Sequence, residues 1–146
     1  MYSSYQIANC MRKYEFLDDV ADVAFKAYGK DINEVFENAA EALESIMISL
    51  EDVALKEALA IEIASDTYED LLYDWLSELL VTFEIESFAI RQCRVTIRGF
   101  SLTAECLGDR IDQSKHRLKE EVKAITYHNL EVTKNDHYHA QVTVDV

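Results

Sequence analysis

The chain has 146 residues, enough for one domain with a buried core, and its 49% hydrophobic and 29% charged residues are typical of a globular protein. Its 28 acidic residues against 14 basic ones give a net charge of −14, which argues against direct binding to nucleic acid or to anionic lipid, because the protein's mean field repels phosphate. With only three glycines, Gly29, Gly99 and Gly108, the sequence contains neither a Walker A loop nor a dinucleotide-binding fingerprint.

The first part of the chain predicts a loose arm followed by two short strands. Residues 1–11 show no hydrophobic period, so we expect a loose N-terminal arm ahead of a domain that spans 12–146. Segments 14–17 and 23–28 are predicted as strands, the second because its apolar residues alternate. Gly29 then supplies a turn.

Two amphipathic helices are predicted next. Asp31 resembles an N-cap, with Glu34 three residues later as in a capping box, and an apolar stripe follows over 32–50. A second stripe, over 71–83, is nearly hydrophobic enough to be buried on two sides, and Ser, Asp and Thr before it are N-cap candidates. The segment 59–64 between the helices is predicted as a strand.

The last third of the chain has a period of two, which is typical of strands. A polar turn is expected at 133–137, between the last two strands. Because two helices come early and several strands come late, we predict an α+β fold, a single domain in which an antiparallel β-sheet is packed on one face by two amphipathic α-helices. The predicted strands of this part are 94–98, 102–106, 122–127 and 140–146.

Oxygen ligands for a metal ion occur at two places. Asp18, Asp19 and Asp22 lie close together between the first two predicted strands, and Asp145 is followed by Val146 with its free carboxylate. Carboxylates without thiolates suit Ca²⁺ or Mg²⁺ better than zinc. The spacing is not that of an EF-hand, and on the residues alone an acidic turn with a solvated chain end is the favoured interpretation.

Other candidate groups favour structural interpretations. His137 and His139 are two apart and would share one face of a strand, but no third metal ligand is obvious, so a surface pair is favoured. His116 follows Asp112 by four residues, which predicts a salt bridge. Cys93 and Cys106 are predicted to be small buried cysteines. The odd cysteine count and the lack of a signal pattern or membrane-length apolar run predict a cytoplasmic protein.

Several blocks of the sequence resemble the archease family. The run 14–29 is similar to the opening signature of that family, with Asp19 and Val20 in place of a His-Thr pair. The resemblance covers about 12–146 in collinear order, and EVKAITYH is its most specific block. The further blocks are EVFENAA (34–40), LLYDWLSELL (71–80), GDRID (108–112) with His116, EVKAITYH (121–128) and the terminal VDV (144–146).

This resemblance implies a small cytosolic α+β protein that partners the RtcB-type tRNA-splicing ligase. That ligase joins RNA ends with GTP and a divalent metal, and archease promotes guanylylation of its active-site histidine, allows many turnovers and can broaden its nucleotide use. The family's metal site, for Ca²⁺ or another divalent cation, falls on Asp22, on Asp145 and on a carboxylate or backbone oxygen of Val146. Asp19 adds either a further oxygen ligand or only negative charge.

Three functions follow from these observations. The first is a non-catalytic ligase activator that acts through a bound cation, with the glutamate-rich face of the first helix as the candidate ligase-facing surface. The second is a general chaperone or modulator of nucleic-acid-processing proteins, with structural carboxylates. The third, ranked last because no oxyanion hole or leaving-group acid is visible, is a hydrolase with Asp22 or Asp145 as general base. The sequence leaves the oligomeric state open.

Overall fold

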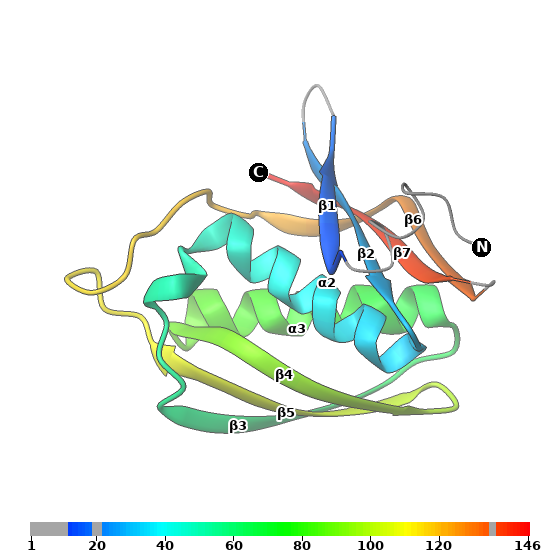
Figure 1. The fold of residues 1–146 in the computed structure, drawn as a ribbon, viewed down its shortest axis with the longest axis horizontal. Helices are drawn as coiled ribbons and strands as arrows, with labels where there is room; N and C mark the ends of the chain where they lie inside the picture. The colour runs from blue at the N-terminus through cyan, green and yellow to red at the C-terminus, as the bar shows by residue number, and fades with distance from the viewer. Residues whose placement is uncertain (1–11, 19–21, 135–136) are drawn as a thin grey trace.

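The structure, a computed structural model, describes residues 12–18, 22–134 and 137–146. Within these residues lie two α-helices and seven strands (Figure 1), and neither helix is long and apolar enough to cross a membrane. The predicted arm, 1–11, lies outside the described residues. The elements are β1 (Tyr14–Leu17), β2 (Val23–Gly29), α2 (Ile32–Met47), a 3-10 turn (Leu50–Asp52), β3 (Glu57–Ala64), α3 (Tyr68–Ile85), β4 (Phe88–Arg98), β5 (Ser101–Arg110), β6 (Ala124–Lys134) and β7 (Tyr138–Asp145).

The strands form two antiparallel sheets with the helices between them (Figure 1). Sheet 1 has the strand order β1-β2-β7-β6 and sheet 2 the order β3-β5-β4. Helix α2 contacts β2 and β7 on one side and β4 on the other, and α3 likewise contacts β6 and both β3 and β4. The predicted α+β class is confirmed. The strands nevertheless divide into two sheets instead of one, because the buried apolar side chains of α3 need cover on both sides and α3 contacts strands of both sheets.

The helix starts agree with the predicted caps. The Asp31 side chain accepts a hydrogen bond from the Glu34 N–H (2.8 Å), and Thr67 caps α3 in the same way. Trp75 of α3 is fully buried, and its indole N–H donates to the carbonyl oxygen of Phe36 in α2 (3.0 Å). This bond fixes the two helices relative to each other at the centre of the core.

The polar face of α2 covers the edge strand of sheet 2. Three N–H groups of β4 donate to side chains of this helix, which replaces the missing neighbour strand. On the glutamate-rich face predicted to meet the ligase, the carboxylates of Glu37 and Glu44 accept hydrogen bonds from β4. Glu44 is buried and cannot contact a partner, whereas Glu37 is half-buried. The pairs are Ile90 with Glu44 (2.6 Å), Val95 with Glu37 (2.8 Å) and Ile97 with Asn33 (2.9 Å).

A long connection, 111–123, carries the chain from sheet 2 to sheet 1. It closes the C-terminal end of α2, since the N–H groups of Lys119 and Glu120 donate to the carbonyl oxygens of Met47 (2.8 Å) and Ile46 (3.0 Å). Strand β6 then runs on to Lys134, so the first two residues of the predicted polar turn at 133–137 belong to a strand, and 135–136 lie outside the described residues. Cross-strand pairing with β7 keeps the first residues of that segment in the sheet.

Candidate metal centre

The structure brings Asp22 and Asp145 together at one end of sheet 1. Asp22 directly precedes β2, and Asp145 is the last residue of β7. Val23 and Val144 are partners in the antiparallel register, so the two aspartates flank the same cross-strand pair. Asp22 is half-buried and Asp145 is exposed. Two acidic segments far apart in the sequence thus meet at one place.

The end of the chain is held beside this pair. The side chain of Val146 packs against the hydrophobic core. Lys123, directly before β6, donates its backbone N–H to the carbonyl oxygen of Asp145 (2.7 Å). This bond holds the end of β7 against the start of β6. From the sequence, Lys123 is predicted only as part of the strand 122–127. No local pattern marks it as a neighbour of Asp145, because the contact depends on strand pairing.

The oxygen ligands at this end of sheet 1 suit a hard cation, but the two aspartate side chains alone do not complete a coordination shell. Among 12–18, 22–134 and 137–146, no three His, Cys, Asp or Glu side chains gather at one point. Asp22 and Asp145 therefore need a further oxygen, which Val146 would provide from its backbone or carboxylate. Asp19 lies outside the described residues. Carboxylate and backbone oxygens are the ligands that Ca²⁺ and Mg²⁺ prefer.

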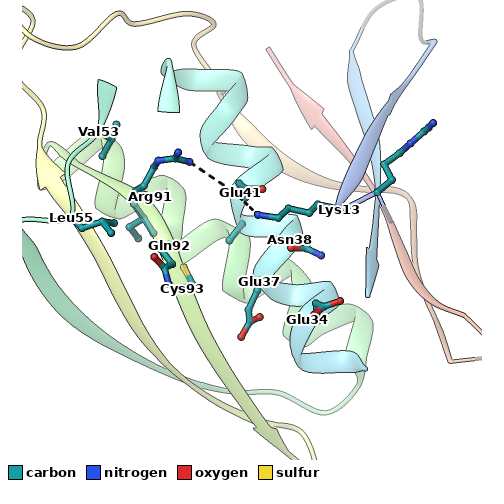
Figure 2. Close-up of a pocket in the computed structure, with 13 residues that line it drawn as sticks. Lys13, Glu34, Glu37, Asn38, Glu41, Val53, Leu55, Arg91, Gln92 and Cys93 are labelled. Atoms are coloured by element: carbon teal, nitrogen blue, oxygen red, sulfur yellow. Dashed lines mark hydrogen bonds and ion pairs between the residues drawn. The ribbon is translucent and has the colours of Figure 1, made fainter. Parts of the chain in front are cut away.

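A second candidate region is the groove of about 550 Å³ between α2 and β4 (Figure 2). Glu41 lies at its centre, with Lys13 Nζ 3.3 Å and Arg91 Nη1 4.0 Å from its Oε1 atom. Glu37 and Cys93 line the same groove. Burial raises the pKa of the Glu37 carboxyl, although the hydrogen bond from Val95 opposes the shift. The groove is polar and of mixed sign, and its lining includes none of the predicted metal residues.

Glu44 is a fully buried acid that sequence reasoning missed. Its Oε1 atom accepts the N–H of Ile90, where a bulge interrupts β4, and its Oε2 atom has no partner among the described residues. Burial raises the pKa of this carboxyl to about 8, since the single hydrogen bond lowers it only in part. The amphipathic pattern placed Glu44 with three other glutamates on a polar face, and nothing local distinguishes it from them.

The cysteine and histidine predictions have mixed outcomes. Cys106 is buried, as predicted, whereas Cys93 is only half-buried. The two are cross-strand partners, and their sulfur atoms lie 3.5 Å apart. The hydrogen bond to Cys106 and burial raise the pKa of the Cys93 thiol, which argues against a nucleophile. The predicted Asp112–His116 salt bridge is wrong. His116 is buried, its Nδ1 atom accepts the backbone N–H of Asp112 (2.9 Å), and its Nε2 atom lies 3.9 Å from an Asp109 carboxylate oxygen.

The histidines near the last turn form no metal cluster with other described side chains. His139 lies in β7, and its ring centroid is 6.3 Å from that of Tyr28 in β2. His137 lies just before that strand. His137 is exposed and His139 is half-buried.

The fold and the strand ends together define the class of protein. It is an acidic α+β protein with two antiparallel sheets around a helix pair and a candidate oxygen-ligand centre at one sheet end. The chain belongs to the archease family, whose model matches residues 14–146. The archease of Methanosarcina barkeri is 43% identical over 141 residues, which are 92% of this chain and 97% of the relative.

Solved structures of relatives share the fold. The solution structure of a Methanobacterium thermoautotrophicum protein superposes with a TM-score of 0.78 at 35% identity, over 93% of this chain and all (100%) of that one. An archease crystal structure from Thermotoga maritima, described as a possible chaperone, gives a TM-score of 0.59 at 22% identity, over 89% and 94% of the two chains. The second likeness concerns the fold alone.

Proposed function

We propose that this protein is a non-catalytic activator of the RtcB-type tRNA-splicing ligase, with a divalent cation held by carboxylates. It promotes guanylylation of the ligase and multiple turnover in cytoplasmic tRNA splicing and RNA repair, and it broadens nucleotide use. The observation that carries the proposal is the position of Asp22 and Asp145 on either side of the Val23–Val144 pair, in a chain that matches the archease family over 14–146.

The charge of the protein supports a protein partner over a nucleic-acid partner. A net charge of −14 repels RNA, so the chain does not compete with the ligase for its substrate. The same charge favours docking against the basic cleft in which a ligase holds RNA. Complementary charge of this kind acts mainly on the association rate, so the stimulation is expected to weaken at high salt.

Asp22, Asp145 and a Val146 oxygen would hold the cation, which in that place supplies positive charge near nucleotide phosphates. The role of the protein in this proposal is to position these oxygen ligands. The β2–β7 register sets the distance between the aspartates, and the backbone bond from Lys123 to Asp145 keeps the chain end in place. Both aspartates are thereby placed at one end of sheet 1.

Multiple-turnover RNA ligation tests this proposal. We expect the wild-type chain, added below the ligase concentration, to raise the number of turnovers at least tenfold. Asp22→Asn with Asp145→Asn removes both negative charges while keeping side-chain size, and this pair should lose the stimulation. The matched control is Asp66→Asn, which removes a carboxylate from the exposed turn before α3.

Calcium titration by calorimetry gives a readout that does not depend on the ligase. The wild type and Asp66→Asn should bind one cation, and the double variant should not. Stimulation that persists in the double variant would keep the ligase partner and reject the role of the cation. Absence of stimulation with any variant would reject the activator function.

A general chaperone is the second candidate. The Thermotoga maritima relative described as a possible chaperone favours its inclusion. A chaperone would suppress the aggregation of unrelated client proteins, whereas the activator would change ligation only with its own ligase. Light scattering of a thermally unfolding client, with and without the chain, separates the two functions.

A further inference from the structure

The edge strands of the two sheets differ in whether side chains hydrogen-bond to their backbone. Side chains of α2 accept three N–H groups along the edge strand β4. Glu69 of α3 likewise accepts the N–H of Val132 in the edge strand β6 (3.1 Å). The other edge of sheet 2 is β3, and no described side chain hydrogen-bonds to its backbone. Covered edges are the usual protection against strand addition. Strand β1, the other edge of sheet 1, has only four residues, so β3 with eight is the longer of the two edge strands without such a side-chain bond among the described residues.

The free edge of β3 is regular over its whole length. All eight residues pair with β5 without a register shift. At the end of the strand, the Ser65 N–H donates to the Phe100 carbonyl oxygen (3.1 Å), which fixes the alternation of the hydrogen bonds. In an antiparallel ladder every second residue points its N–H and C=O away from its partner. The four residues that do so here are Ala58, Ala60, Glu62 and Ala64.

The side chains of these four residues leave the edge open. All four are exposed on the outer face of sheet 2, and three of them are alanines, which do not shield the backbone. On the inner face, Leu59 and Ile63 are only partly buried at this edge. Proline, lysine and bulges, which normally block strand addition, are absent from β3. An added strand would therefore gain backbone hydrogen bonds and bury apolar surface.

The charge of the β3 edge favours a basic strand of another protein over a second copy of this chain. Glu57 is paired with Arg110 (3.5 Å), which leaves Glu62 as the carboxylate of β3 without an ion pair among the described residues. A second copy paired about Ile61 would place its own Glu62 about 7–8 Å away on the diagonal, and it would bring together two chains of net charge −14. A basic strand opposite Glu62 meets no such repulsion.

We propose that the free edge of β3 is a docking site for an extended segment of a partner protein that alternates apolar and basic residues. Apolar side chains of that segment lie opposite Leu59, Ile61 and Ile63, and a lysine or arginine lies opposite Glu62. The site belongs to sheet 2 and the candidate metal centre to sheet 1, so the proposal does not rest on the ligase function.

The test uses the octapeptide KVKVTVKV, blocked at both ends, with the isotope-labelled full chain. We expect amide chemical shifts to change in 57–65 and hydrogen exchange to slow at Ala58, Ala60, Glu62 and Ala64. The isomer KKVVVVTK has the same composition without the alternation and should bind at least about tenfold more weakly. Equal binding of the two isomers would overturn the proposal, because it would show attraction to net charge alone.

Two variants separate charge from backbone pairing. Glu62→Lys should weaken KVKVTVKV at least about tenfold and favour EVEVTVEV, whereas Glu51→Lys, an equal charge change on an exposed turn, should not. Ala60→Pro removes one free-edge N–H without removing a bond to β5, and it should abolish binding while thermal unfolding verifies the fold. Unchanged binding in Glu62→Lys or in folded Ala60→Pro contradicts the proposal. Protection of the edge amides that rises with protein concentration alone would instead identify a second copy as the occupant and overturn the proposal.

Discussion

Replacing Gly108 with alanine is expected to destabilise the fold by about 3 kcal/mol or more. A Cβ atom built at this position would lie 1.9 Å from the carbonyl oxygen of Ala89 and 2.9 Å from its carbonyl carbon. Both are backbone atoms of β4, so neither can rotate away. The close approach arises where the β4–β5 register shifts between Ile90 and Gln92. Relief of the clash requires the two strands to separate, with loss of ladder hydrogen bonds.

Denaturant unfolding followed by circular dichroism measures this effect. The matched control is Gly99→Ala in the turn of the same hairpin, where φ is +61° and no atom lies within 4 Å of the added Cβ. That substitution costs only the backbone strain of a left-handed residue, about 1 kcal/mol. Similar losses at both positions would contradict the close approach of the two strands at Gly108.

Replacing Glu44 with glutamine is expected to flatten the pH dependence of stability. Burial raises the pKa of this carboxyl to about 8, above the ordinary value of 4.5 that the unfolded chain retains. The stabilisation from the neutral form is complete below pH 4.5 and is lost as the pH rises toward 8. Over that range the contribution of Glu44 falls by about 1.4 kcal/mol for each pH unit.

Glutamine keeps the acceptor for the Ile90 N–H but cannot ionise, so Glu44→Gln should lack this slope. Glu44→Ala removes the acceptor and leaves a cavity, and it should be less stable than Glu44→Gln at every pH. The comparison requires unfolding free energies from pH 5 to 8 for both variants and for Glu51→Gln, which removes an exposed acidic group. Parallel curves for wild type and Glu44→Gln would show that the buried carboxyl does not titrate in this range.

Local patterns carried much of the fold prediction. The stripe on α2, the cap at Asp31 and the alternation of the later strands reflect interactions close in sequence, and the structure confirms them. The second sheet has no such local signal. The second sheet is required because α3 buries side chains toward two sides. The nearly all-round hydrophobicity of 71–83 indicated that both sides are covered, but not which elements cover them.

The missed residues share one physical cause. Glu44 is buried because a strand far along the chain needs an acceptor at Ile90, and His116 is turned toward Asp109 by the path of the 111–123 connection. Asp22 and Asp145 are adjacent through strand pairing, which no spacing rule reveals. Only the family resemblance joined the two aspartates, and the register is consistent with that expectation.

The most direct test of the proposed function is the rate at which GMP is transferred from labelled GTP to the ligase. We predict that the chain accelerates this step at a low molar ratio, that Asp66→Asn does so equally, and that Asp22→Asn with Asp145→Asn does not. An unchanged guanylylation rate in the presence of the folded, calcium-binding wild type would contradict the account.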